Sequence, residues 1–443
     1  MDAVYGNAHL TIIAAAGGDS AYGLPGVGLR PRVTQQLISL GKTTFIRTFT
    51  HLQETLKASK WATRGWTFQE GVLSTRKLIF TDHQVAFQCN GMHCSEAVCW
   101  PFQLMHAKTQ KSFSGRVPNP IIAPLIEKKE FNRYRPYLNL AKLVQEYSVR
   151  SLTNPSDRLK AILGILSSWE KRKDPIYHVW GVLVSPNFNR MLNATDGWEI
   201  RLGGWFHQEP CTRQPTFPSW SWAGWSGAFV RTQHLFVTNR NVFQTWLEKD
   251  DPSRGQSPAR ISLPTFVIQH DEHREYSVAT SFIQLKVSAI EVTFTSVRWT
   301  ASEAWKWAYY RHGDDPSQPR GNAFKDGIYA EFQYRGYVEL WYFYADDEGL
   351  DLASLPERRL MALLLESTLH GSKKFIVVAP KQGYYERVGY LNCGAHTGTH
   401  PDVTYRRADG TLTKTRPPPP LGGEGGNYLN WEQGLRTMHI RLG

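Results

Sequence analysis

The most informative stretch of the sequence reads WATRGWTFQEGVLSTRKLIF and occupies residues 61–80. Its first ten residues carry two tryptophans and lead into a short helix, and Lys77–Phe80 is an apolar run typical of a strand. Gln84–Cys89 is a second run of this kind, and the polar residues 81–83 between the two have the length of a hairpin turn. This block therefore predicts a short helix followed by two paired strands.

The opening of the chain predicts a buried strand and a tight loop. Leu10–Ala16 is an apolar run with β-branched residues, and Gly17, Gly18 and Asp19 end it. The glycines superficially resemble a phosphate-binding loop, but no Gly-Lys-Ser/Thr follows and the spacing is not that of a dinucleotide fingerprint. We expect them to reverse the chain with positive φ angles. The loop itself is made by Gly23, Leu24, Pro25 and Gly26.

Two helices are predicted after residue 135. The first spans 137–150, and the second spans 156–170 with Ser156 as its N-cap, because apolar residues recur there at helical spacing. One face of the first helix carries Leu140, Val144 and Tyr147.

After residue 200 the sequence predicts a β-rich region. Short runs rich in β-branched and aromatic residues alternate there with Gly, Pro and Asp turns. Residues 360–365 are compatible with a strand or with a buried helix, and the Pro/Gly segment 416–426 is expected to be a loop. The clearest strand-like runs are 283–290, 336–343 and 374–379.

Composition and charge exclude several classes of protein. The 443 residues are 41% hydrophobic and 13% aromatic, which is enough to bury a sizeable core and argues against disorder. There are 51 Lys and Arg against 39 Asp and Glu, a net charge of +12, but the basic residues are scattered, whereas nucleic-acid binders usually concentrate them on one face. We therefore expect no nucleic-acid partner.

The sequence also indicates the compartment. No apolar run approaches the ~20 residues that a bilayer span needs, and the N-terminus lacks the basic segment of a secretory signal. Five cysteines are few and odd in number, which favours a reducing compartment over a disulfide scaffold. We expect a cytoplasmic protein without a membrane span.

Taken in order along the chain, these blocks resemble the fungal heterokaryon-incompatibility (HET) domain family. The resemblance begins with Tyr5–Ala8, Thr11–Ala14 and the Gly23–Gly26 loop. It continues through the tryptophan block, where the family pattern falls on Arg64, Gly65, Trp66, Gln69 and Glu70. Residues 147–165 resemble the helical stretch that often follows the domain. A later segment, 217–225, resembles one common in large fungal proteins of this type and carries Trp220, Trp222 and Trp225.

The resemblance implies an α+β protein in three parts. Residues 1–98 would be the C-terminal portion of a TIR-like α/β HET domain, residues 99–200 a mainly helical connector, and residues 201–443 a β-rich C-terminal region. Domains of the family normally begin with further strands and a Trp-Ile-Asp…Cys-Ile-Asp-Gln motif, which this sequence lacks. We therefore expect the chain to hold only the later part of the domain.

Two functions are implied by the resemblance. The first is a signalling or interaction module of fungal non-self recognition (heterokaryon incompatibility) and regulated cell death, not catalytic in this form, with another protein as partner and no cofactor. The second is a NAD-cleaving, TIR-like effector whose activity needs the absent N-terminal strands. The absent motif favours the first function and leaves the catalytic residues unassigned.

Arg64 and Glu70 are the first residues that could carry chemistry. They flank a predicted helix start, where an arginine can clamp a carboxylate or a phosphate and a glutamate is favoured by the helix dipole. The plainer expectation is an internal ion pair between them that holds the turn at Trp66 in place.

Cysteines and histidines near residue 90 suggest a zinc site only weakly. Structural zinc sites usually take one close pair of ligands and a second pair after a spacer. Here no second pair follows, and Cys89 ends a strand, so we expect no metal. The residues concerned are His83, Cys89, His93, Cys94 and Cys99.

The later tryptophans are too large and apolar to be left in water. Alternation places Trp220 and Trp222 on one face of a predicted strand. They could form a platform on which a sugar or a base stacks, but a hydrophobic junction between the two halves of the chain is the plainer expectation.

Overall fold

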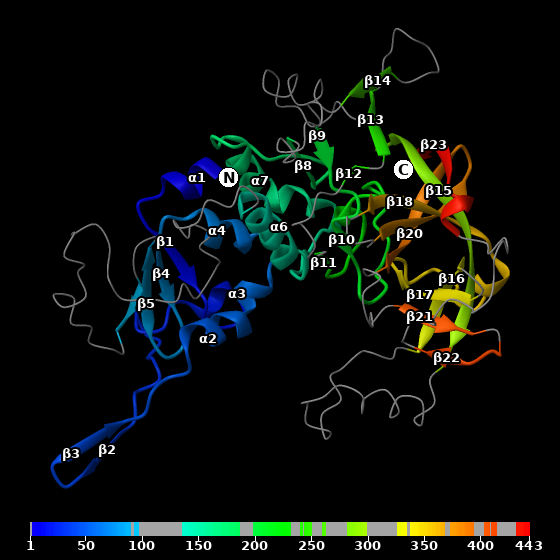
Figure 1. The fold of residues 1–443 in the computed structure, drawn as a ribbon. Coiled ribbons are helices and arrows are strands. Elements are labelled where there is room, and N and C mark those ends of the chain that lie inside the picture. Colours follow the sequence, from blue (N-terminus) through cyan, green and yellow to red (C-terminus); the bar gives the residue numbers. More distant parts are fainter. Residues whose placement is uncertain are drawn as a thin grey trace, which may run out of the picture. The chain divides into compact units, whose positions relative to one another are not determined.

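The structure is a computed structural model that describes most of the chain (Figure 1). The described residues are 2–89, 93–96, 135–186, 198–231, 240–241, 243–249, 259–262, 281–298, 326–334, 337–367, 373–393, 403–407, 409–413 and 431–443. They fall into two compact units, unit 1 over Met1–Tyr177 and unit 2 over His178–Gly443. The three-part division that the resemblance implies stays a prediction, and the expected loop 416–426 lies outside the described residues.

Unit 1 mixes short helices with short strands. Its strands are β1 (Thr11–Ala14), β2 (Leu37–Leu40), β3 (Thr43–Ile46), β4 (Arg76–Phe80), β5 (Val85–Cys89) and β6 (His93–Ser95). Its helices are α1 (Asp2–Asn7), α2 (Leu52–Ala58), α3 (Lys60–Thr63), α4 (Thr67–Leu73), α6 (Arg135–Ser148) and α7 (Lys160–Glu170). Among the described helices, none is both long and apolar enough to cross a membrane.

Four strands of unit 1 form one sheet in the order β1-β4-β5-β6. β1 runs parallel to β4 with Ile13 beside Ile79, and both side chains are fully buried. β4 and β5 form the hairpin predicted from the sequence, closed by Thr81, whose hydroxyl donates to the Gln84 carbonyl at 2.8 Å. In the described part of the chain, β1 therefore has a strand neighbour on one side only.

The remaining two strands of unit 1, β2 and β3, pair with each other as a separate antiparallel hairpin. We call residues 37–46 the arm. Figure 1 shows the arm extending away from the other elements of unit 1. Every residue of its two strands is exposed. This hairpin was not predicted from the sequence.

The helices confirm one prediction and correct another. The helix predicted over 137–150 is α6, and its expected face is buried. The second helix begins at Lys160, so the prediction of a start at Ser156 is wrong. Pro155–Asp157 is instead a turn of 3₁₀ helix, whose N-cap is Asn154 because its side chain accepts the Ser156 N–H at 3.2 Å.

Unit 2 consists mainly of strands, as the sequence predicted for the region after residue 200. The shorter ones are β7 (Tyr177–Val179), β8 (Val182–Pro186), β9 (Trp198–Ile200), β10 (Trp205–Phe206), β11 (Val230–Arg231), β12 (Arg240–Asn241), β14 (Ala259–Ser262), β21 (Val403–Arg406) and β22 (Leu412–Thr413). The longer ones are β13 (Phe243–Lys249), β15 (Ile283–Val297), β16 (Gly327–Tyr334), β17 (Tyr337–Ala345), β18 (Leu360–Ser367), β19 (Lys373–Lys381), β20 (Tyr384–Cys393) and β23 (Arg436–Leu442). The ambiguous run 360–365 is thus a strand, β18.

The large sheet of unit 2 is organised around β15. Its order is β12-β18-β19-β20-β23-β15-β16-β17-β21-β22, and β13 joins β14 to β15. β15 is long enough to change partners: it begins between β13 and β23, continues beside β18 over Ala289–Val292, and ends beside β16 over Thr293–Val297. Because β17 also pairs with β20, the strands close around an interior.

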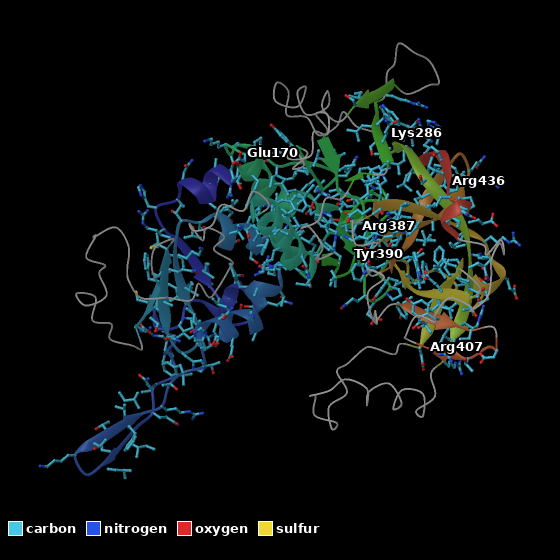
Figure 2. All side chains as sticks on the ribbon, viewed as in Figure 1. Glu170, Lys286, Arg387, Tyr390, Arg407 and Arg436 are labelled. Atoms are coloured by element: carbon cyan, nitrogen blue, oxygen red, sulfur yellow. The ribbon has the colours of Figure 1, made fainter. Side chains whose placement is uncertain are left out.

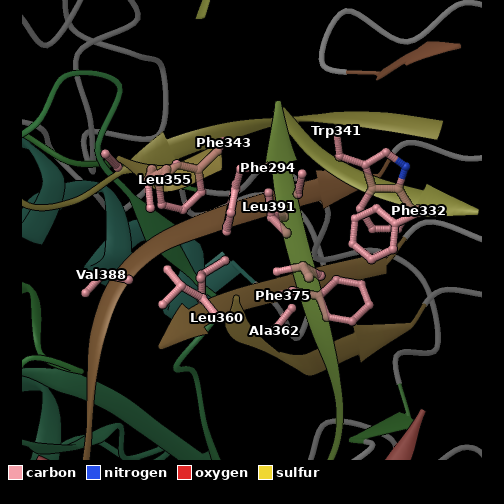
Figure 3. Packing of buried hydrophobic residues seen from close by; sticks show 14 of the residues in the cluster. Phe294, Phe332, Trp341, Phe343, Leu355, Leu360, Ala362, Phe375, Val388 and Leu391 are labelled. Carbon is pink, nitrogen blue, oxygen red and sulfur yellow. The ribbon is translucent and has the colours of Figure 1, made fainter. Parts of the chain in front are cut away.

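That interior holds the main core of the unit (Figure 3). The rings of Phe332 and Trp341 lie 4.1 Å apart between centroids, and Phe375 lies 5.6 Å from Trp341. These three side chains are almost fully buried. Burial of aromatic side chains from strands far apart in sequence therefore stabilises the sheet.

Candidate functional site

The tryptophan block of unit 1 is joined to a segment that lies about 85 residues later in the sequence. The Gly65 N–H donates to the Ser151 carbonyl at 2.7 Å, and the Ser151 N–H donates to the Thr63 carbonyl at 2.7 Å. A Cβ atom on Gly65 would lie 2.6 Å from the Leu152 side chain. The glycine of the motif is therefore needed for close packing, and the two sequence blocks form one structure.

A half-buried arginine reinforces this junction. Arg150 donates from Nη1 to the Arg64 carbonyl at 3.2 Å and to the Thr67 hydroxyl at 3.4 Å. Its guanidinium lies 4.5 Å from the centre of the Phe68 ring. Burial lowers the pKa of Arg150 to about 10, so the side chain is still a cation at neutral pH. Arg150 thus clamps the start of α4.

Gln69 fits α4 against α7. Its side chain is fully buried, and Nε2 donates to the Lys160 carbonyl at 3.4 Å. A Cβ atom on Gly164 would lie 2.2 Å from the side-chain oxygen of Gln69. The small residue at 164 and the amide at 69 therefore serve the same helix–helix contact.

Glu70 is the acidic residue of the block, and its environment differs from the expected one. Its Oε2 accepts a hydrogen bond from Trp61 Nε1 at 3.0 Å. Burial and the nearby Glu70 carboxylate raise the pKa of Tyr5. Arg64 is exposed and, among the described residues, forms no ion pair with Glu70. The predicted Arg64–Glu70 ion pair is therefore wrong, because the indole of Trp61 takes the place of the arginine.

A hollow of about 500 Å³ opens in the loop that follows β1, and a hydrogen bond from Tyr22 ties this loop to Asp82 after β4. The Tyr22 hydroxyl donates to Asp82 Oδ1 at 2.5 Å, and this hydrogen bond raises the pKa of Tyr22. The Arg30 guanidinium stacks 3.8 Å above the centre of the Tyr22 ring. The lining residues are Tyr22–Leu24, Val27 and Leu29–Pro31. Open α/β sheets bind ligands at this end of their strands.

Three of the four glycines have the predicted positive φ angles. Gly17, Gly23 and Gly26 have φ angles of 71°, 73° and 81°, in the left-handed region. A Cβ atom on Gly17 would lie 2.1 Å from the Tyr22 ring. Gly18 does not share the positive φ. The three positive φ angles confirm the predicted chain reversal.

The residues of the suggested zinc site lie on one hairpin and one neighbouring strand. Cys89 ends β5, while His93 and Cys94 lie on β6 beside it. His83 is in the turn before β5, where its ring stacks on Phe49 at 5.3 Å between centroids. Cys99 lies outside the described residues, and within them no group of three or more metal-ligating side chains is found.

The tryptophans of unit 2 are buried inside that unit. Trp220, Trp222 and Trp225 are at most 2% exposed, and their Nε1 atoms donate to carbonyls of Ser281, Gly181 and Ser219 at 3.0, 2.8 and 2.9 Å, respectively. The predicted strand is wrong, because Trp222–Gly224 is a turn of 3₁₀ helix with Ser221 as N-cap. Rings covered in this way have no open face for a sugar or a base, so they form core.

Unit 2 contains a buried charged cluster that was not predicted from the sequence. Arg387 donates from Nε to Asp346 Oδ2 at 2.7 Å, and Nδ1 of His207 lies 2.9 Å from Asp346 Oδ1. All three side chains are fully buried, and Figure 2 labels Arg387 within the unit. The guanidinium also stacks 3.6 Å from the Trp205 ring centre and donates to two carbonyls. Every charge in the cluster is thus paired.

The family comparison matches the part of unit 1 that contains both the hollow and the tryptophan block. Residues 1–70 match the family model Heterokaryon incompatibility protein (HET). This match confirms the family resemblance expected from the sequence. No curated protein and no solved structure matches the chain.

The HET match ends at Glu70. The residues that stabilise the end of the matched segment lie later in the sequence, outside the match. Arg150, Ser151 and Gly164 hold the HET motif in place, although all three follow it by 80 residues or more. Their packing shows that the HET segment is one compact body with the later helices of unit 1.

Proposed function

We propose that the protein is a HET-type module of fungal non-self recognition, the process called heterokaryon incompatibility, and of the regulated cell death that accompanies it. The observation that carries the proposal is the family match over residues 1–70. In this proposal unit 1 has a TIR-like α/β fold, acts in the cytoplasm as a signalling and interaction module, and takes another protein as its partner.

The geometry of the motif supports a role in recognition. Gly65, Thr67 and Gln69 are buried and hold α4 against the segment 150–164, so they maintain a shape and present nothing to solvent. The rim of the hollow is different, since Val27 is 56% exposed and Leu29 fully exposed. Exposed apolar side chains next to a structured loop suit contact with a protein.

Gene disruption tests this proposal in the organism that carries the sequence. The disrupted strain is paired with strains that reject its parent, and we expect at least one pairing to form a viable heterokaryon. Reintroduction of the wild-type gene should restore rejection. Unchanged rejection in every pairing would contradict the proposal.

One observation favours a second candidate, the NAD-cleaving effector. Glu70 is a half-buried carboxylate that Trp61 holds in a fixed position, and fixed carboxylates are a requirement of glycosidic bond cleavage. Incubation with NAD of the chain extended by the N-terminal strands of a complete HET domain, which the second candidate requires, separates the candidates. The first proposal expects no release of nicotinamide. Release that is lost in Glu70→Gln and retained in Glu54→Gln, an exposed glutamate of the same unit, would favour the effector.

A further inference from the structure

The net positive charge of the chain belongs almost entirely to unit 1. Residues 1–177 contain 23 Lys and Arg against 12 Asp and Glu, a net charge of +11, whereas residues 178–443 contain 28 against 27. The basic residues are scattered along the sequence, but the acidic residues that balance them are in unit 2. An anionic partner is therefore attracted to unit 1 and not to unit 2.

The arm lies in a stretch of unit 1 that has no acidic residue. Between Asp19 and Glu54 the sequence contains neither Asp nor Glu. Lys42 lies in the turn of the arm and Arg47 directly after its second strand, and both are exposed. The arm thus has a cation at each end. The basic residues of the whole stretch are Arg30, Arg32, Lys42 and Arg47.

One face of the arm is apolar along nearly its whole length. Cross-strand pairing sets Ile38 opposite Phe45 and Leu40 opposite Thr43. Because side chains alternate along a strand, these four residues share one face. Ile38, Leu40 and Phe45 are 63%, 65% and 55% exposed. We call these three side chains the apolar face.

The opposite face of the arm is polar toward the turn. Ser39 and Thr44 lie opposite each other there, and their hydroxyls are hydrogen-bonded at 3.1 Å. Leu37 and Ile46 are on this face only at the base of the arm. The arm is therefore an amphipathic hairpin, with an apolar face on one side, hydroxyls near the turn on the other and cations at the ends.

The arm is closed at its base without a partner. The Arg47 N–H donates to the Gln36 carbonyl at 2.9 Å, and Arg47 Nη1 donates to the Gln36 side chain at 2.9 Å. Among the described strands, β2 and β3 pair only with each other, so their outer edges present backbone groups to solvent. These groups would lose their hydrogen bonds in a hydrocarbon core, but an arm that lies flat at an interface keeps them in contact with water.

We propose that the arm binds the anionic surface of a lipid bilayer. The apolar face lies at the level of the lipid headgroups, and Lys42 and Arg47 meet the lipid phosphates. Charge complementarity supports this occupant, because the cytoplasmic leaflet is negatively charged and attracts basic segments. Interfacial elements bind by this combination of an apolar face with cations. The inference goes beyond the proposed function, which concerns a protein partner, and does not depend on it.

The composition of the arm favours a bilayer over other anionic partners. A nucleic acid is bound mainly through hydrogen bonds to phosphates and base edges, so it would leave the apolar face in water. A standard protein interface takes about 20–30 residues from each side and close shape complementarity, which a strip of three apolar side chains does not supply. A bilayer needs no complementary shape, and it can cover the whole apolar face.

Flotation of the full chain with lipid vesicles tests the proposal. We expect binding to phosphatidylcholine vesicles that contain about 30% phosphatidylserine, and no binding to vesicles of phosphatidylcholine alone. Binding should weaken about 10-fold or more when the salt concentration is raised from about 50 to about 500 mM, because salt screens the attraction. A wild-type chain that does not bind the phosphatidylserine vesicles would overturn the proposal.

The double variant Ile38→Ser, Phe45→Ser tests the apolar face without changing the charge. We expect it to bind the phosphatidylserine vesicles about 10-fold or more weakly than wild type. Val149→Ser, at an equally exposed apolar residue of unit 1 outside the arm, is the control and should bind like wild type. A double variant that binds as tightly as wild type would show that only general charge attraction acts, and would overturn the proposal.

A second pair of variants tests the cations of the arm. Lys42→Gln, Arg47→Gln should weaken binding about 10-fold or more. Lys286→Gln, Arg436→Gln removes the same charge from exposed positions of unit 2, which Figure 2 labels, and should bind like wild type. Equal losses in the two double variants would contradict a contact through the arm.

Hydrogen exchange locates the contact in the wild-type chain. On addition of the phosphatidylserine vesicles we expect slower exchange of the backbone amides of residues 37–46 and unchanged exchange in β15 of unit 2. Binding to the vesicles without protection of residues 37–46 would exclude the arm as the contact.

Discussion

The two units of the protein differ in how many of their large apolar side chains are exposed. Thirteen large apolar side chains are exposed in the described residues, and all but Leu352 lie in unit 1, although unit 2 is the longer. Both units also bury charged side chains, namely Lys77 and Arg158 in unit 1 and the pairs Asp346–Arg387 and Glu366–Lys374 in unit 2. The difference indicates that unit 2 closes its sheet on itself, whereas unit 1 presents surface that another molecule can cover.

Replacing a core tryptophan of unit 2 should have the largest effect on the free energy of unfolding. We expect Trp222→Ala to lower the free energy of unfolding by about 4 kcal/mol, because a fully buried ring and its hydrogen bond to the Gly181 carbonyl are lost. Calorimetry of the full chain measures this change. A variant that melts like wild type but loses binding to a partner would instead place Trp222 on a recognition surface.

Breaking the buried charge cluster should have the second-largest effect on the free energy of unfolding. Arg387→Met leaves Asp346 buried without its cation, and we expect a loss of about 3 kcal/mol in the free energy of unfolding. Arg359→Met is the matched control, because the Arg359–Glu291 pair is solvent-exposed and should contribute less than about 1 kcal/mol. Equal losses in the two variants would contradict the contrast between buried and exposed pairs.

A change at the contact between α4 and α7 of unit 1 should lower the free energy of unfolding by less. In Gly164→Ala the new methyl group meets the Gln69 side chain, and we expect a loss of about 1–2 kcal/mol after the gain in helix propensity is included. Gly6→Ala, which has open space around it in α1, should be neutral or slightly stabilising. Urea unfolding of both variants checks the difference.

Acidification should weaken unit 2 through Asp346. Burial alone would raise the pKa of this carboxyl, but the Arg387 charge and the His207 hydrogen bond outweigh burial and lower it. A carboxyl with a lowered pKa stabilises the fold above its unfolded pKa of about 3.9, and this stabilisation is lost as pH falls through the folded value. The stability difference between wild type and Asp346→Asn should therefore shrink below about pH 4. A difference that stays constant with pH would contradict this assignment.

The smallest effect is expected on the arm. Phe45→Ala should change the free energy of unfolding by less than about 0.5 kcal/mol, because the ring is already 55% exposed. Phe375→Ala, at a fully buried ring of unit 2, is the comparison and should cost several-fold more. Similar losses at both positions would mean that the arm is packed in the monomer.

Features of the fold that depend on local pattern could be predicted from the sequence. The β4–β5 hairpin and the buried face of α6 follow from alternation and helical spacing within a few residues. The arm was missed because Leu37 and Ile38 are adjacent apolar residues, without the alternation that marks a strand with one covered face. The tryptophan segment was misread because its alternation resembles a strand, whereas Gly224 packs against the Pro218 carbonyl and turns the chain.

The site depends on contacts that no local pattern signals. The Arg64–Glu70 pair was expected because the two residues are neighbours in sequence, but the carboxylate meets Trp61. Arg150, which contacts the Arg64 carbonyl, lies 86 residues away. Asp346 and His207 are 139 residues apart and lie in segments with no charged pattern in common. Only the folded structure brings such residues together.

The place of β23 in the sheet has a consequence for synthesis on the ribosome. Residues 436–442 lie between β15 and β20, so they fill an interior position although they are made after every other strand of the sheet. Until residue 442 leaves the ribosome, the position between β15 and β20 is empty. Both strands then expose pairing edges to other nascent chains. Unit 1 can complete its fold hundreds of residues earlier, whereas unit 2 acquires its native sheet in one late, long-range step, and chaperone binding during translation is expected to concentrate on that interval.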